Sequence, residues 1–348
     1  MLLKNLYTTR SFRLGVFVLA VVLCQFAYTY VIEQQEYELR QKLELEGLEN
    51  TLILAGELGN VERELMGIVS FFHASETVTR SGFKTYVTPL FEHHEFIDSL
   101  MWIPRVSHSH RHALESIVQE DGYDDFKFSV FDDNYSLVPA PDKDEYFPII
   151  YMEPRSGIDA LLGLDVRALP TLFDLMNEVP ASGKPIVTYT QYWFKYDEEK
   201  YWFKYAEEKT ALIFAPFYSS KEIPKTIEDR KRQFRGAVVG AYRMGDMIGQ
   251  MVNPYVGNDI SLAVFDEDYK EKLTGKALTK FEGFDADPKN KLFGEIHEDA
   301  VMEYQSLLGF FGRRLGFVWQ AHKESHGYQG TPGDCLASTE CGPTELKS

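Results

Sequence analysis

Histidine side chains gather at two places in this chain and are the first candidates for metal chemistry. His108, His110 and His112 alternate with other residues, and the pair His93–His94 lies nearby in the sequence. On a β-strand, alternating histidines share one face and could bind Zn²⁺ or Cu²⁺. The segment that carries them is typical of the start of a helix, however, where such spacings diverge around the axis. We therefore favour a solvated polar surface and expect no metal site.

Carboxylate side chains are the second candidates, because a pair of them can perform acid–base catalysis. They cluster at 142–145 (DKDE), 197–199 (DEE) and 207–208 (EE). All three clusters fall in predicted loops, where runs of charge usually form solvated turns. The sequence also contains no G-x-S-x-G elbow, no H-E-x-x-H helix and no P-loop. We therefore expect neither an enzyme nor a bound cofactor, and an anchored hydrolase is the least favoured function.

One apolar segment precedes all of these residues and determines where they lie. Leu14–Ile32 contains no charge, and a helix of that length rises about 28 Å, enough to cross a bilayer. Basic residues precede the segment and acidic residues follow it: Lys4, Arg10 and Arg13, then Glu33, Glu36 and Glu38. Because positive charge stays in the cytoplasm, we predict a cytoplasmic tail at 1–13 and a single transmembrane helix at 14–32. The main domain would then lie in the periplasm, with the span in a bacterial inner membrane.

The alternative for this segment is a cleaved signal peptide. Its apolar run is longer than a typical signal-peptide core, and it ends without a small-x-small cleavage site. Tyr28 and Tyr30 are instead typical of side chains that anchor a helix at the membrane interface. We therefore favour an anchor.

The composition limits the partners of the chain. Its 348 residues include 36 Lys and Arg against 53 Asp and Glu, a net charge of −17, which disfavours a nucleic-acid partner. Apolar residues make up 44% of the sequence, enough for one large or two medium cores. Of the three cysteines, Cys24 lies in the apolar segment, and Cys335 and Cys341 could pair in an oxidising compartment.

A long helical pattern follows the apolar segment at 33–74, with leucines recurring near the helical period. One interpretation is a stalk that packs against its twin in a homodimer; the other is a helix packed on its own domain. Because the leucine spacing is too irregular for a strict coiled coil, both interpretations stay open.

Helices and strands alternate after Ser75. Helices are predicted at 83–94, 110–119, 170–178 and 244–251; strands at 97–106, 126–131, 147–152, 186–196, 210–218, 234–243, 260–265 and 312–320; and a charged loop at 221–232. A tandem repeat, YWFKYDEEK at 192–200 and YWFKYAEEK at 201–209, can lengthen a hairpin without changing the strand period. Residues 323–348 are rich in Gly, Pro, Ser and Thr and are predicted to be disordered.

Four segments in order give the middle of the chain a family resemblance. They are LMWIPRV at 100–106 with Arg111, YFPIIYMEP at 146–154 running on to LGLDV at 162–166, FAPFY at 214–218, and RGAVVG at 235–240 with Arg243. Over roughly residues 75 to 250 the chain resembles a CHASE domain, an extracytoplasmic sensor module of histidine kinases and nucleotide cyclases.

The resemblance implies an α+β fold in which the membrane helix continues into a long stalk helix and two PAS-like mixed α/β units follow. It implies a membrane-distal unit at 75–250 that binds a small molecule, and a membrane-proximal unit at 251–322. Plant members hold cytokinin partly through an aspartate at the position that Pro154 occupies here, so we expect a different ligand.

A PAS-like sheet would present strand residues to an apolar cavity with a few polar anchors. The predicted ligand-binding residues comprise five wall residues, Tyr151, Val187, Tyr189, Phe214 and Tyr218, and three polar anchors, Glu153, Arg155 and Thr188. Asp165 is a further polar candidate, or it forms a structural ion pair with Arg105. Tyr151 and Phe214, as aromatic residues on strands, are more often plain core.

The predicted function is a membrane-anchored, extracytoplasmic small-molecule sensor of a signal-transduction receptor. A signalling member would continue through a second span into a kinase or cyclase, so we expect a truncated or output-less form. The alternative is an anchored periplasmic protein that binds a ligand or a partner without signalling.

Overall fold

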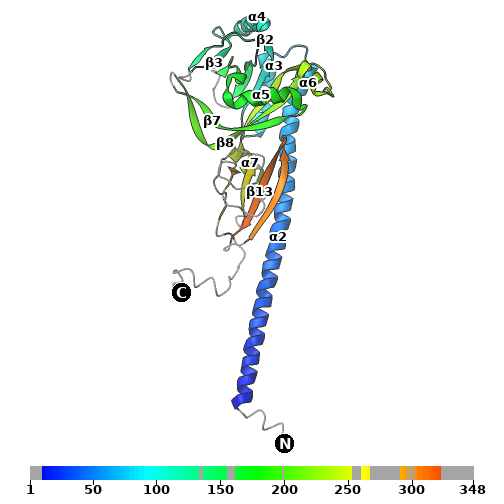
Figure 1. Cartoon of the computed structure of the whole chain (residues 1–348), viewed down its shortest axis with the longest axis vertical. Helices are drawn as coiled ribbons and strands as arrows, with labels where there is room; N and C mark the ends of the chain where they lie inside the picture. Colours follow the sequence, from blue (N-terminus) through cyan, green and yellow to red (C-terminus); the bar gives the residue numbers. More distant parts are fainter. Residues whose placement is uncertain are drawn as a thin grey trace.

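The computed structural model describes residues 10–132, 136–154, 161–197, 200–252, 260–266, 291–294, 296–297, 300 and 302–322. The molecule is elongated along a single helix, α2 (Arg10–Ala74, 65 residues). Two β units lie beside the C-terminal part of this helix, while its N-terminal part extends alone (Figure 1). We call the unit farther from the N-terminal end of α2 the distal unit and the nearer one the proximal unit. The predicted tail at 323–348 lies outside the described residues.

Helix α2 is continuous through both predicted segments, 14–32 and 33–74. Residues 13–31 are exposed along its free end, and this is the one helix of the described residues that is long and apolar enough to cross a membrane. Farther along, apolar side chains return every three or four residues and are buried: Leu54, Leu58, Val61, Leu65 and Ile68. The N-terminal part of the helix is therefore apolar and exposed, whereas its C-terminal part is amphipathic and packs its apolar side on the two units.

The distal unit is built on a five-stranded antiparallel sheet in the order β6-β1-β9-β8-β7. Its strands are β1 (Ile97–Pro104), β6 (Tyr151–Pro154), β7 (Ile186–Asp197), β8 (Lys200–Tyr218) and β9 (Phe234–Arg243). In chain order this arrangement is 2-1-5-4-3, so the first and last strands pair at the centre. The predicted strand at 234–243 is confirmed, and β1 and β7 follow their predicted ranges closely.

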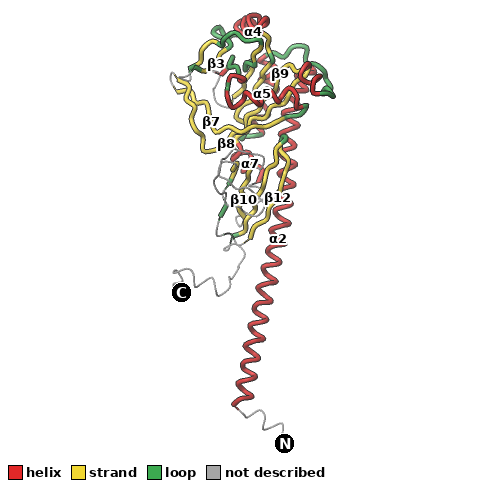
Figure 2. The backbone as a smooth tube through the Cα atoms, in the orientation of Figure 1, coloured by secondary structure: helices red, strands yellow, loops and turns green. Residues whose placement is uncertain are grey.

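Helices cover both faces of this sheet (Figure 2). Helices α2 and α3 (Arg80–His93) pack on one face, and α5 (Pro170–Ser182) packs on the other. Helix α5 begins with Pro170 at its first turn and ends at Gly183 in the left-handed conformation (φ 68°), as expected for helix termini.

Helix α4 and four short strands belong to the distal unit as well. Helix α4 (His108–Glu120) lies at the end of the molecule farthest from the N-terminus, near the small pairings of β2 (Val106–Ser107) with β5 (Glu145–Tyr146) and of β3 (Ser129–Phe131) with β4 (Leu137–Pro139) (Figure 1).

The predicted charged loop at 221–232 is wrong in its second half, where α6 (Ile227–Gln233) forms. The Thr226 side chain accepts a hydrogen bond from the Asp229 backbone N–H and caps the helix. This helix is polar except for the exposed Ile227 at its start, and it buries no residue. The hydrophobic period therefore gave no signal for it, whereas the capping threonine did.

The tandem repeat lengthens the β7–β8 hairpin, as predicted. The described residues of both copies lie in β7 and β8, with Tyr192 opposite Tyr205, Phe194 opposite Phe203 and Tyr196 opposite Tyr201. A register shift separates this extension from the part of the hairpin in the main sheet, between Thr190 and Tyr192.

The proximal unit follows α7 (Met244–Val252) and has a four-stranded antiparallel sheet in the order β11-β10-β13-β12. Its strands are β10 (Ile260–Asp266), β11 (Lys291–Phe293), β12 (Met302–Phe310) and β13 (Arg313–Ala321). Strand β12 was not predicted. Five of its nine residues are only partly buried and three are exposed, so its hydrophobic alternation is weak.

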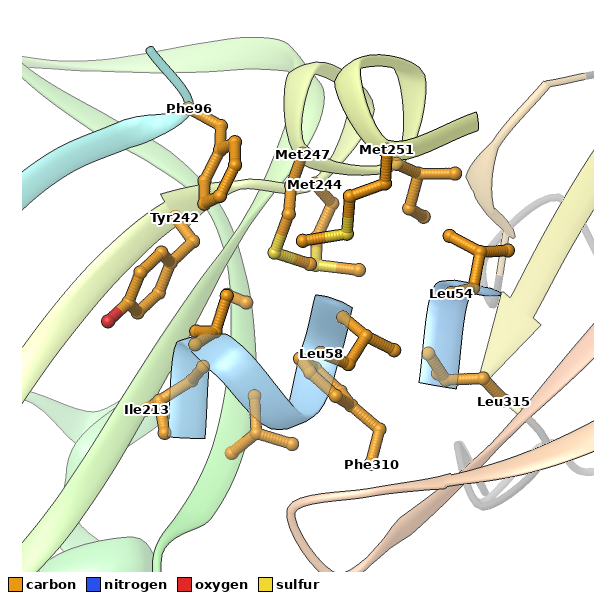
Figure 3. Packing of buried hydrophobic residues seen from close by; sticks show 14 of the residues in the cluster. Leu54, Leu58, Phe96, Ile213, Tyr242, Met244, Met247, Met251, Phe310 and Leu315 are labelled. Atoms are coloured by element: carbon orange, nitrogen blue, oxygen red, sulfur yellow. The ribbon is translucent and has the colours of Figure 1, made fainter. Parts of the chain in front are cut away.

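One hydrophobic core joins α2 to both units (Figure 3). Met244, Met247 and Met251 on α7 lie between Tyr242 of the distal sheet and Leu315 of the proximal sheet. Leu54 and Leu58 of α2 belong to the same cluster. The two units and the helix are therefore packed as one body and not as separate modules on a linker.

Candidate ligand-binding cavity

A cavity with an almost wholly apolar lining lies on the face of the distal sheet that is turned away from α2. The two faces can be told apart by their cores: Leu100 and Ile213 pack toward α2, whereas Met101 and Phe214 pack toward α5. The cavity measures about 70 Å³. It is lined by Met101, Ile103, Ile149, Met152, Leu161, Leu164, Val166, Leu169, Leu172, Leu212, Phe214, Val239 and Ala241, and by the polar residues Asp98, Ser99, Thr190 and Thr210.

Strand register arranges the cavity floor in rows that change from apolar to polar. Met152, Met101, Val239 and Phe214 form one row across the sheet. The next row contains Ser99 opposite Ala241, which in turn lies opposite Leu212. Beyond it, Thr210 lies opposite Arg243. The polar residues are therefore collected at one end of an otherwise apolar floor.

An ion-pair network lies at this polar end. Asp98 is 7% exposed, and its Oδ1 lies 3.7 Å from Nη1 of Arg243. The same arginine pairs with Asp246 and donates a hydrogen bond to the backbone oxygen of Glu95 (2.6 Å). Several partners thus hold the guanidinium in place beside the cavity.

Asp165 organises the opposite wall, the segment that covers the floor. Its buried carboxylate accepts hydrogen bonds from the backbone N–H of Phe147 (3.1 Å) and of Arg167 (3.3 Å), and from Nζ of Lys143 (3.2 Å). These bonds support the neighbouring Leu164 and Val166, which line the cavity. The Arg105–Asp165 ion pair considered from the sequence is not the arrangement found, since Arg105 pairs with Glu145 (2.7 Å).

A glycine in the left-handed conformation determines the course of the backbone in this wall. Gly163 has φ 87°, and a side chain there would collide with the backbone oxygen of Lys127. Its backbone N–H donates to Ile149 O (2.8 Å), and its own oxygen accepts from Ser129 (2.9 Å). The close approach of three segments at this point requires glycine.

Three of the predicted ligand-binding residues belong to the cavity face of the sheet. Phe214 lines the cavity. Thr188 lies between Ile186 and Thr190 in strand alternation and opposite Leu212, but is not among the lining residues. Tyr218 belongs to the core beside the cavity, where its hydroxyl donates to Pro180 O (3.2 Å) and accepts from the Gly183 N–H (3.1 Å).

Three others lie on the α2 face. Val187 and Tyr189 pack into the cluster around α2. Tyr151 donates a hydrogen bond from its hydroxyl to Val78 O (2.8 Å) and packs against Phe83. Burial raises the pKa of the Tyr151 phenol. The structure therefore divides the predicted wall residues between the two faces of the sheet.

The remaining two predicted residues are polar. Glu153 lies 3.6 Å from Nζ of Lys84 in a partly exposed ion pair. Arg155 lies outside the described residues.

The sequence did not identify the polar end of the cavity, formed by Asp98, Ser99, Thr190 and Thr210. One signal was available: Asp98 and Ser99 interrupt an apolar strand, and both are buried. The register shifts between Ile97 and Ser99, and such bulges can redirect side chains toward a site.

The alternating histidines lie on helix α4, as their context predicted. His108 contacts the hydroxyl of Tyr146 (3.1 Å), His110 contacts Ser107 (2.6 Å), and His112 lies 3.7 Å from Glu115. Among the residues that the structure describes, no group of three or more potential ligands could hold a metal ion.

A buried ion pair fixes α4 to the loop beneath it. Arg111 and Glu115, 9% and 8% exposed, lie 3.0 Å apart. Arg111 also donates to Ala140 O (2.9 Å), and Glu115 accepts from the Phe128 N–H (2.9 Å). Both charges are therefore satisfied within the distal unit.

A wider, open groove of about 740 Å³ runs between α4 and the β2–β5 pair. Its lining includes Arg105, Glu145 and the exposed side chain of Ile117. Arg105 and Glu145 pair with each other, so this open groove combines an ion pair with apolar side chains, whereas the lining of the cavity is almost wholly apolar.

The family model for the CHASE domain matches residues 76–275 of the chain. Among curated proteins, the "Hybrid signal transduction histidine kinase A" of Dictyostelium discoideum is 24% identical over 230 residues. That alignment covers 63% of this chain but 10% of the histidine kinase, so the chain spans about a tenth of that relative.

Two solved sensory domains are similar over most of their length. The periplasmic sensory domain of the Campylobacter jejuni chemoreceptor Tlp1 shares 11% identity over 86% of this chain and 99% of its own, with a TM-score of 0.44. The ligand-binding domain of the Pseudomonas aeruginosa amino acid chemoreceptor PctC shares 11% identity over 79% and 97%, with a TM-score of 0.38.

Proposed function

The chain belongs to the CHASE domain family, whose match covers more than half of its residues, and from this premise we propose that its distal unit binds a small molecule in the apolar cavity. CHASE domains are extracytoplasmic sensor domains, and this chain is accordingly an extracytoplasmic sensor. The observation that carries the proposal is the cavity itself: an apolar space with its polar groups at one end, between the five-stranded sheet and α5. Ligand sites in proteins have this composition.

Phe214 is the predicted ligand-binding residue that this proposal retains as a direct contact, because it lines the cavity. Thr188 and Tyr218 lie beside the cavity on the same face of the sheet and are not proposed to contact the ligand directly. Tyr151, Glu153, Val187 and Tyr189 act indirectly, by fixing the sheet on α2 and α3.

The free end of α2 is proposed to anchor the sensor in a membrane. Its apolar window has a mean hydropathy of 2.1, and none of it is buried in the protein. With basic residues before the span and acidic residues after it, the N-terminus would lie in the cytoplasm and both β units outside.

A second copy of the chain is the proposed partner of α2. Leu45, Leu48 and Leu52 follow one another at spacings of three and four and are 66%, 46% and 65% exposed. Leu43 and Leu54, on the other side of the helix, are buried against the chain's own core. A parallel pair of helices would cover the exposed leucines with their counterparts, in line with two membrane spans running side by side.

The shared core supports a route from the cavity to the membrane. Strand β9 supplies Val239 and Ala241 to the cavity and continues directly into α7. The methionines of α7 pack on Leu58 of α2 and on the proximal sheet (Figure 3). If binding changes the position of β9, α7 would therefore move with it and shift its contacts with α2 and with the proximal sheet. In the proposed receptor, this motion controls a signalling output.

A thermal-shift screen of the full chain in detergent tests the binding function. Carboxylates, purines, peptides, amines and alcohols are added, and a compound at a hundredfold its dissociation constant should add about 2.7 kcal/mol of stability. Ala241→Leu fills the cavity and should abolish the shift, whereas Ala113→Leu, the same change in the open groove, should retain it. The absence of any shift in the wild-type chain, or an unchanged shift in Ala241→Leu, would count against binding in this cavity.

A further inference from the structure

The charge of the cavity lining distinguishes between classes of ligand. Among the lining residues that the structure describes, Asp98 is the one acidic or basic residue, and Ser99, Thr190 and Thr210 contribute hydroxyl groups. The other thirteen lining residues are apolar. From this composition we infer that the cavity binds a short aliphatic amine, with its ammonium group at Asp98 and its carbon chain toward Met101 and Phe214. The inference rests on the proposed function and specifies its ligand class.

The chemistry of an ammonium group matches the polar end. It carries three N–H donors and no acceptor, and Asp98, Thr190 and Thr210 all offer acceptor oxygens. A buried charge is tolerated when it is paired and hydrogen-bonded. A carboxylate can accept about four hydrogen bonds, so Asp98 can hold Arg243 and a ligand at the same time. No cation lines the described part of the cavity, because Arg243 pairs with Asp98 from outside the lining. An anionic ligand would therefore meet a carboxylate at this polar end.

The volume limits the carbon chain. A cavity of about 150 Å³ holds benzene, with six carbons, so the 70 Å³ here corresponds to roughly three or four non-hydrogen atoms. Met101 and Met152 line the floor, and methionine adapts its shape more easily than branched side chains. A chain somewhat longer than propyl could therefore still enter, but a bulky cation could not.

A matched ligand series tests the inference on the full chain in detergent. Primary n-alkylammonium chlorides from methyl to hexyl, the corresponding alcohols and the corresponding sodium carboxylates are compared at equal ionic strength. The melting temperature should rise most with ethyl- to butylammonium, less with the alcohols, and not with the carboxylates. Tetraethylammonium serves as the control for non-specific attraction to this acidic chain and should have no effect.

Two carboxylates that each pair with a basic residue, one inside the cavity lining and one outside it, provide the test and control variants. Asp98→Asn removes the charge in the cavity and should raise the amine concentration needed for a given shift by about tenfold or more, as expected for a hydrogen bond to a charged group. Glu46→Gln removes a carboxylate that pairs with Lys42 on α2 and lies outside the lining, and it should leave the amine response unchanged. Each shift is measured against the variant's own melting temperature. If Asp98→Asn does not fold, Thr210→Val tests the same end of the cavity and should weaken the amine response.

The outcomes separate this inference from the proposed function. A shift with carboxylates or purines but not with amines would overturn the amine assignment and leave the binding function standing. An amine effect that is independent of chain length, shared by tetraethylammonium or unchanged in Asp98→Asn would also overturn it. No shift with any compound would overturn both.

Discussion

Gly47 and Gly56 give a sharp test of how α2 packs on the proximal unit, because they differ in surroundings but not in backbone. Both lie inside the same helix. A Cβ at Gly47 would collide with the ring of Tyr304 and approach Cδ1 of Trp319 at 3.2 Å, whereas one at Gly56 has nothing within 4 Å. The contact around Gly47 also includes Thr51, which accepts a hydrogen bond from Nε1 of Trp319 (3.3 Å).

Alanine at each position therefore separates helix propensity from packing. Replacing glycine by alanine inside a helix stabilises it by about 1 kcal/mol, and this gain applies to both variants. Overpacking a close contact costs about 1–3 kcal/mol, and this cost applies to Gly47→Ala alone. We expect Gly56→Ala to stabilise the chain and Gly47→Ala to be neutral or to destabilise it by up to about 2 kcal/mol.

The difference between the two variants isolates the packing cost. At about 2–4 °C per kcal/mol for a domain of this size, their melting temperatures should differ by about 2–12 °C. Thermal unfolding of the full chain in detergent, followed by circular dichroism, measures it. Equal stabilisation by both substitutions would refute the close contact between α2 and strands β12 and β13.

Three further predictions concern other parts of the fold. Arg111→Met leaves the buried carboxylate of Glu115 without its ion-pair partner and should lower the free energy of unfolding by about 3–5 kcal/mol; a double variant with Glu115→Leu should recover part of this in thermal unfolding. Burial, followed by the charge of Lys221, lowers the pKa of His73 below 6.5. The unfolded chain therefore binds more protons than the folded chain as the pH falls through that value, and stability decreases. His73→Gln should reduce this acid-side decrease in melting temperature, and an equal or steeper decrease would contradict the assignment. Leu48→Cys, with all three native cysteines replaced by serine, should form a disulfide-linked dimer on oxidation, whereas a chain that stays monomeric in sedimentation would refute pairing through α2.

The order of elements was predictable where hydrophobic period and length agreed. The span and the stalk were predicted as one helical path, and α2 is continuous across them. Strand β9 is buried on nearly all of its length, so its apolar run gave its bounds directly. The polar α6 and the half-exposed β12 lacked such a signal, because neither presents a regular apolar face to the core.

The site was less predictable than the fold. To place a strand residue in the site, one must know its alternation in the strand and also which face of the sheet bears the cavity. Neighbouring residues of a strand point to opposite faces, and in this sheet both faces are buried, one by α2 and the other by α5. Tyr189 and Thr190 are adjacent in the sequence, yet only Thr190 lines the cavity. Sequence alone identified aromatic strands but could not assign their side chains to a face. The bulge that turns Asp98 toward the cavity is likewise a property of strand pairing.

The location of the bound ligand is the most direct test of the central claim, that the distal cavity is the sensing site. Hydrogen exchange of backbone amides is measured on the full chain with and without the compound that gives the largest thermal shift. We expect slower exchange in the wall at 161–172 and in β9, which line the cavity. Protection confined to the open groove between α4 and the β2–β5 pair, with no change in that wall, would contradict the claim.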